Sequence, residues 1–168
     1  FIFDKDDGVD FIDHFKFKRY HIDDIVLENS FNKELSFKLK RTMEPFSGII
    51  YSDQGNIGLA LNGKANGLFV FFNDDSINDS IKERTHYLNG KKDGQSLVWY
   101  QNQQLHKNVN YKNGLLNGSF KEFFKSGGIS SEGNYANDRK IGFWREFIGD
   151  KIELKGNYSE LKGDYPNE

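Results

Sequence analysis

The sequence predicts an all-β protein built as an elongated antiparallel sheet of consecutive β-hairpins. Asn-Gly dipeptides recur at Asn62-Gly63, Asn89-Gly90 and Asn113-Gly114, and both residues tolerate the positive φ angles of tight hairpin turns. Turn residues return every ~8–12 positions, which is typical of all-β chains. Gly and Asn also interrupt every window that could hold a helix.

These dipeptides belong to an internal repeat of about 24 residues. Two register marks recur along the chain. A second glycine follows each turn at Gly67, Gly94, Gly118 and Gly142, with intervals of 27, 24 and 24 residues, and a leading tyrosine recurs at Tyr87, Tyr111, Tyr135 and Tyr158. Together they define four blocks near residues 60–77, 87–105, 111–129 and 135–152, with partial copies at both ends.

Each block is expected to form one strand after its second glycine, a polar turn, and a return strand. The return strands are predicted to begin at Ile77, Leu105, Ile129 and Ile152. The fifth position after the second glycine is aromatic in all four blocks, and the second position is aromatic in all but one, where it is Ser96; Phe120 and Phe123 are an example of such a pair. Strict alternation would place these two positions on opposite faces, so a shared face requires a β-bulge between them. We expect the aromatic side chains to form a ladder along the whole sheet.

The chain divides into an N-terminal segment, residues 1–45, and the repeat array, residues 46–168. Residues 15–20 and 35–41 alternate polar and apolar side chains, which predicts two strands. Repeat arrays need their terminal units covered. The N-terminal segment is therefore expected to be a β cap over the open end of the array.

Composition excludes several functional classes. The formal charge of −2 provides no positive field for nucleic acid. The chain has no Cys, and its longest apolar run, residues 68–72, is far shorter than the ~20 residues of a membrane-spanning helix. A chain that begins at Phe1 indicates removal of an upstream segment, which leaves cytoplasmic and exported locations both open.

No residue pattern indicates catalysis, a cofactor or a metal. The four histidines lack metal-ligand spacing, and the acidic stretch 4–13 fails the calcium-loop register because Val9 and Phe15 occupy its key positions. Glu122 and Glu146 occupy equivalent positions and are expected to lie ~10 Å apart, two strands away. A glycosidase could use such a pair. Repetition of one solvent-facing position in successive blocks explains the pair more simply. We predict that the protein is not an enzyme.

The repeated pattern YxNGKxxG, followed by an aromatic strand and a turn, resembles the variant MORN repeat of bacteria. As a whole, the chain resembles the YwqK-type antitoxin family over residues 46–158. Asp138 and Ile141 depart from the pattern in the fourth block, and Ala60 in the first. The resemblance implies a non-catalytic antitoxin or immunity protein that neutralises a cognate toxin by binding it.

A protein partner is therefore expected, at apolar positions that vary between blocks. These candidates are Phe71, Tyr100, Phe124 and Ile148. Packing of the same residues beneath the N-terminal segment is the alternative interpretation.

Two other functions remain open. A membrane-surface module for anionic lipid would use the cations that recur near the turns: Lys64, Lys91, Lys92, Arg139 and Lys140. A structural cell-envelope protein is the other possibility. The sequence leaves the oligomeric state open.

Overall fold

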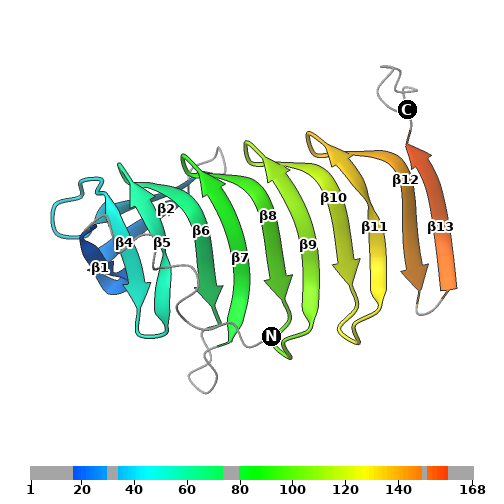
Figure 1. Ribbon diagram of the computed structural model, residues 1–168, viewed down its shortest axis with the longest axis horizontal. Coiled ribbons are helices and arrows are strands. Elements are labelled where there is room, and N and C mark those ends of the chain that lie inside the picture. The colour runs from blue at the N-terminus through cyan, green and yellow to red at the C-terminus, as the bar shows by residue number, and fades with distance from the viewer. Residues whose placement is uncertain (1–16, 30–33, 74–79, 149–150, 159–168) are drawn as a thin grey trace.

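The computed structural model describes residues 17–29, 34–73, 80–148 and 151–158, and it confirms an all-β fold (Figure 1). A short 3-10 helix, η1 (Ile22–Asp24), lies near the start. The strands are β1 (Arg19–His21), β2 (Ile25–Asn29), β3 (Leu35–Leu39), β4 (Gly48–Ser52), β5 (Gly55–Leu61), β6 (Lys64–Phe72), β7 (Ile81–Leu88), β8 (Lys91–Trp99), β9 (Leu105–Lys112), β10 (Leu115–Phe123), β11 (Ile129–Ala136), β12 (Arg139–Ile148) and β13 (Lys151–Tyr158).

The strands form one open sheet in which β4 to β13 follow each other in chain order. Each neighbouring pair in this series is antiparallel, so the predicted sheet of consecutive hairpins is confirmed. Figure 1 shows these hairpins side by side along the long axis. β1 extends the sheet by pairing in parallel with β4.

The predicted Asn-Gly turns form a continuous row, here called the turn row. Both central residues of each turn have positive φ, as in Asn89 (51°) and Gly90 (84°), which is the type I′ geometry. Asn137 and Asp138 keep the same geometry, with φ of 49° and 65°, although Asp replaces Gly. The Gly90 amide donates to the Ala65 carbonyl at 2.8 Å, which links one turn to the next. Equivalent bonds join Gly114 to Lys92 and Asp138 to Leu116.

The predicted bulges are present in β6, β8, β10 and β12. In each strand the register shifts between the fourth and fifth positions after the second glycine, as between Glu122 and Phe123 in β10. The return strands β9 and β11 begin at Leu105 and Ile129, as predicted, and β13 begins one residue before Ile152. β7 begins at Ile81, and the predicted start at Ile77 lies outside the described residues.

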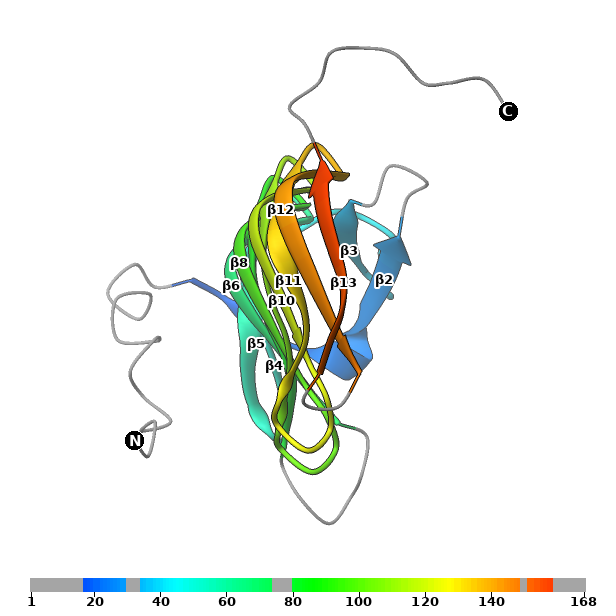
Figure 2. The ribbon, with the colours of Figure 1, turned by 90° about the vertical axis from the view of Figure 1, so that its right-hand side faces the viewer.

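The N-terminal segment covers a face of the sheet as well as its end. β2 and β3 form a hairpin, here called the cap hairpin, that lies over one side of the array (Figure 2). We call that side the inner face. The prediction for residues 35–41 is confirmed by β3, whereas in 15–20 only Arg19 and Tyr20 belong to a strand, and 15–16 lie outside the described residues.

The hydrophobic core lies between the cap hairpin and the first hairpins of the array. Phe37 of β3 is 2% exposed and stacks on Phe69 of β6, with ring centroids 5.7 Å apart. Phe69 in turn meets the edge of Tyr87 at 5.4 Å. Phe71 is partly buried against the same cluster. Of the buried hydrophobic residues, Val109 and Trp144 lie farther along the array, beyond this cluster.

Candidate functional site

The inner face changes character where the cap hairpin ends. Its central row runs across successive strands by direct cross-strand pairing: Phe69, Thr85, Ser96, Val109, Phe120 and Gly133. Phe69 is fully buried beneath the cap hairpin, but Phe120, at the equivalent position of β10, is only half-buried. We call the inner face of β8 to β13 the open face.

The expected aromatic ladder is interrupted at β7 and β8. Thr85 and Ser96 face each other there, with their hydroxyl oxygens 2.5 Å apart. Both side chains are buried, and the Thr85 hydroxyl also donates to Glu83 at 2.7 Å. A pair of small polar residues therefore divides the rings into two clusters, one under the cap hairpin and one on the open face.

The second aromatic cluster lines a hollow of about 400 Å³ on the open face. Tyr135 meets Phe120 and Trp144 edge-on, with ring centroids 5.3 and 5.0 Å apart. Trp144 fits against β11 because Gly133 has no side chain there; a Cβ atom at that position would lie 2.3 Å from the indole ring. The Trp144 Nε1 donates to the Asn134 carbonyl at 3.1 Å, which fixes the orientation of the ring.

A lysine and a glutamate also line this hollow. Lys140 Nζ lies 4.2 Å from the centre of the Trp144 ring and 2.7 Å from the Glu146 carboxylate. Burial alone would lower the pKa of Lys140, but the hydrogen bond and charge of Glu146 outweigh it and raise the pKa overall. The site therefore keeps an ammonium group over an aromatic ring, a favourable cation–π arrangement.

Glu122 and Glu146 lie two strands apart, as predicted, with Ser131 between them in register. Both line the hollow. Glu122 pairs with His106 and with Lys107, each at 3.2 Å, and Glu146 pairs with Lys140. The hollow therefore carries two carboxylates, each in contact with basic side chains of this chain.

A second depression, of about 620 Å³, lies between the cap hairpin and the open face; we call it the cap groove. Its floor carries Phe71, Tyr87 and Tyr111, and Leu27 of β2 forms part of its wall. Burial, reinforced by the charge of Glu83, raises the pKa of the Tyr87 hydroxyl, so this group stays neutral.

The four predicted binding residues occupy different environments. Phe71, the penultimate residue of β6, lies against the core with its ring centroid 6.2 Å from that of Phe69, so packing beneath the N-terminal segment describes it better. Tyr100 stacks on His106 at 4.2 Å and donates its hydroxyl to the Phe123 carbonyl at 2.8 Å. Phe124 is half-buried just after β10. Ile148 is 65% exposed at the end of β12 and borders the hollow.

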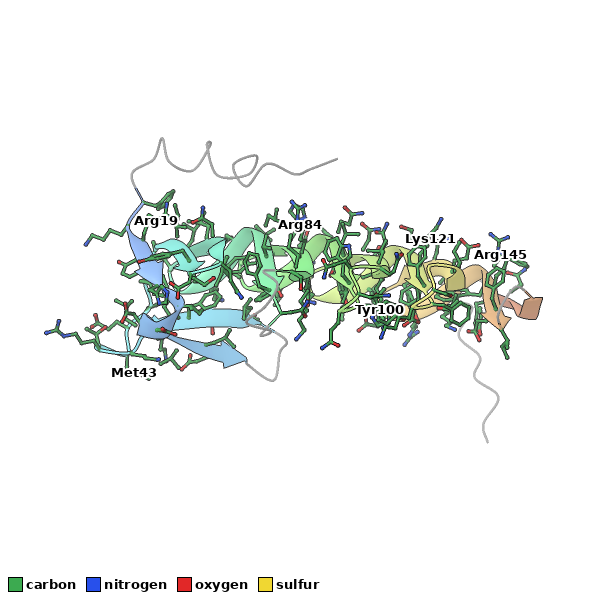
Figure 3. The ribbon with its side chains drawn as sticks, turned by 90° about the horizontal axis from the view of Figure 1, so that it is seen from below. Arg19, Met43, Arg84, Tyr100, Lys121 and Arg145 are labelled. Atoms are coloured by element: carbon green, nitrogen blue, oxygen red, sulfur yellow. The ribbon has the colours of Figure 1, made fainter. Side chains whose placement is uncertain are left out.

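The outer face of the array carries charged side chains. Figure 3 shows Arg84, Lys121 and Arg145 on the outer face, opposite the cap hairpin. Lys121 and Arg145 both pair with Glu132 there. The aromatic hollow and the cap groove are confined to the inner face.

Sequence reasoning missed the Lys140–Trp144 pair and the cap groove. The Lys140–Trp144 pair could have been predicted, because both residues follow the fourth turn on one strand and lie four positions apart, which places them on the same face. The cap groove left no such signal, since it depends on where the cap hairpin docks.

In the described part of the chain, no group of three or more His, Asp or Glu side chains could hold a metal ion. His21, His86 and His106 lie on separate strands, and His14 and the acidic stretch 4–13 fall outside that part. Within the same ranges, no helix is long and apolar enough to cross a membrane.

Comparison of the chain with protein-family models, curated proteins and solved structures finds no match.

Proposed function

We propose that this chain is a non-catalytic protein-binding module and that its partner occupies the open face. The observation that carries the proposal is the contrast along the inner face. The chain covers Phe69 and its neighbours with its own hairpin, yet leaves Phe120, the equivalent ring of β10, half-buried beside an open hollow. Aromatic side chains are enriched at protein–protein hot spots.

The partner class comes from the sequence. The resemblance of residues 46–158 to the YwqK-type antitoxins supports an immunity role, in which the partner is a toxin that the chain neutralises by binding. A broad, rigid sheet face suits this role, because a pre-organised surface loses little entropy on association.

The membrane-surface alternative has weaker support. Four of the five cations near the turns form ion pairs with acidic side chains: Lys64 and Lys91 with Glu34, Lys92 with Glu83, and Lys140 with Glu146. These pairs reduce the positive charge that anionic lipid would attract. Sedimentation with anionic and neutral vesicles tests this alternative, and salt-sensitive binding to the anionic vesicles alone would favour it.

A matched pair of variants on β11 tests the proposal. Ser131 faces the hollow between Glu122 and Glu146, whereas Asn134 is an exposed residue of the same strand outside the hollow. Ser131→Lys would fill the hollow, with a carboxylate on each side to accept the new charge. Asn134→Lys adds the same charge elsewhere and serves as the control.

The immobilised wild-type chain and both variants are exposed to lysate and secreted fractions of the source organism. We expect one protein to be retained in stoichiometric amount by wild type and Asn134→Lys, but not by Ser131→Lys. Expression of that protein alone should arrest growth, and co-expression of this chain should restore it. Retention of no protein, or equal retention by all three chains, would overturn the proposal.

A further inference from the structure

Within the residues that the structure describes, the cap hairpin has an unpaired strand edge beside the open face. Among the described strands, β1, β2 and β13 each have a neighbour on one side only. Natural sheets protect such edges with charged residues, proline, bulges or very short strands. The three edges of this molecule differ in whether they carry that protection.

Two of the edges are protected. β1 spans three residues, Arg19–His21, and begins with an arginine. β13 has the sequence KIELKGNY, with charged residues throughout its first half. β2 instead begins with three apolar residues, Ile25-Val26-Leu27, of which Ile and Val have high β propensity, and its pairing with β3 contains no bulge. Its one charged residue, Glu28, pairs with Lys38 of β3. Leu27 is 45% exposed.

The hydrogen-bond pattern shows which groups β2 presents at this edge. The amides of Leu35 and Phe37 in β3 point away from β2, since they donate to the carbonyls of Gly90 and Gly63 at 2.7 and 2.6 Å. Residues of an antiparallel pair alternate between facing the partner strand and facing away. Leu27 lies opposite Phe37, so its N–H and carbonyl point away from β3.

The cap groove lies beside this edge and is suited to the side chains of an added strand. Leu27 and Leu35 line it on the cap side, and Phe71, Tyr87 and Tyr111 on the array side. Its charged lining residues are Lys82, Lys92 and Glu83. Two lysines and one glutamate leave a single positive charge, which favours an acidic residue in the occupant.

We propose that β2 pairs through its outer edge with an extended segment of the protein partner. The segment adds a third strand to the cap hairpin and places alternate apolar side chains in the cap groove. This is recognition by β-strand addition, in which main-chain hydrogen bonds provide affinity and side-chain pockets provide specificity. The inference rests on the proposed function, because it names how the partner of the open face would bind.

A defined peptide tests the inference without the natural partner. The probe is a fluorescein-labelled peptide of alternating valine and threonine with an acidic end, and fluorescence anisotropy measures its binding to the full chain. Leu27→Pro removes the outward N–H of β2 while leaving the bonds to β3, since proline is tolerated at strand edges. Leu27→Ala keeps the N–H and shortens only the side chain, which makes it the matched control.

We expect saturable binding to wild type, a loss of at least about tenfold in Leu27→Pro, and a smaller loss in Leu27→Ala. A probe with N-methylated alternate residues should bind wild type no more tightly than the original probe binds Leu27→Pro. Absence of saturable binding, or equal binding by Leu27→Pro and wild type, would overturn the inference. If circular dichroism shows that Leu27→Pro does not fold, Leu27→Lys, which places a charge at the groove, must abolish binding instead.

Sedimentation equilibrium examines the other occupant, a second copy paired through β2. A concentration-dependent dimer that Leu27→Pro abolishes would assign the edge to self-association and contradict the inference. The proposed function is tested separately through Ser131 and the retained protein. If Ser131→Lys abolishes retention of the protein but Leu27→Pro leaves peptide binding unchanged, the proposed function stands and only this mode of binding is rejected.

Discussion

The capped and open halves of the array share one backbone plan but differ in what covers their inner face. In the capped half, Phe69 is fully buried beneath Phe37 and beside Tyr87. In the open half, Phe120 remains half-buried at the equivalent position. The hairpin repeat therefore sets the sheet, and the cap hairpin encloses one half of it in a continuous hydrophobic core. In the open half, Val109 and Trp144 are buried outside that cluster, at 3% and 2% exposed.

The turns explain how the open half persists without such a cover. Successive turns are joined by backbone bonds, such as that from the Gly114 amide to the Lys92 carbonyl at 2.8 Å. Side chains reinforce them, because Asn66 accepts from the Asn89 amide at 3.1 Å and Asp93 accepts from the Asn113 amide at 3.0 Å. At the matching position of the fourth block, Ile141 has no polar side chain, and the fourth turn is the last of the row in the described part of the chain.

The largest expected effect comes from truncating the same ring in each half. Phe69→Ala should lower the free energy of unfolding by about 3–5 kcal/mol, because it empties a buried site. Phe120→Ala should cost roughly half as much, since water already reaches that ring. Urea denaturation of the two variants measures both losses, and equal losses would contradict the division into a core half and an open half.

The glycines beneath the rings sharpen the comparison. A Cβ atom at Gly58 would lie 2.7 Å from the Phe69 ring, and one at Gly133 would lie 2.3 Å from Trp144. Overpacking of this kind costs about 1–3 kcal/mol when the surroundings cannot move. Gly58→Ala and Gly133→Ala should therefore both destabilise the fold, because Phe69 and Trp144 are 0% and 2% exposed and the Trp144 ring is held by its bond to the Asn134 carbonyl. Thermal unfolding followed by circular dichroism measures both losses; a negligible loss for Gly133→Ala alone would show that Trp144 can move into the hollow.

Tyr100 links neighbouring hairpins at the end of the array opposite the turn row. Removal of its hydroxyl in Tyr100→Phe should cost about 0.5–1.5 kcal/mol, because the hydrogen bond to the Phe123 carbonyl is lost. Chemical denaturation measures the loss. If Tyr100→Phe is as stable as wild type, yet weakens capture of the retained protein, the tyrosine acts in binding, as the sequence suggested, rather than in linking the hairpins.

The smallest expected effect is a pH dependence at Asp93. The bond from the Asn113 amide, helped by Lys112 and opposed by burial, lowers the pKa of Asp93. Because its pKa is lower in the folded state, ionised Asp93 stabilises the fold at any pH above its pKa in the unfolded chain, ~3.9. This contribution is lost as the pH falls through the pKa of the folded state. The melting temperature of Asp93→Asn should therefore fall less than that of wild type when the pH is lowered from neutral to about 3. Asn66 fills the same role in the first block, so the substitution suits the site. Identical pH profiles would contradict the assignment.

Much of the sheet followed from local residue chemistry. The Asn-Gly turns and the bulges were predictable because positive φ and the spacing of aromatic side chains act within a few residues. The position of the cap hairpin was not, because β2 has the short sequence IVLEN without a clear alternation. The break in the aromatic ladder was visible as Ser96, but its pairing with Thr85 depends on register across two strands.

The candidate site was predictable only in part. Tyr100, Phe124 and Ile148 occupy equivalent positions after the bulges, yet Tyr100 and Ile148 differ in exposure and partners. The hollow arises where Gly133 admits Trp144, and the cap groove arises where β2 meets the array. Both depend on contacts between segments far apart in the chain.

Hydrogen–deuterium exchange of the chain, alone and with the retained protein, tests the central claim most directly. The claim is that the capped half is a finished core and that the open half is completed by a partner. Alone, amides of β4 to β7 should exchange more slowly than those of β10 to β13, and the partner should slow exchange mainly in β9 to β13 and in β2. Uniform exchange in the free chain, or protection by the partner confined to β4 to β7, would contradict it.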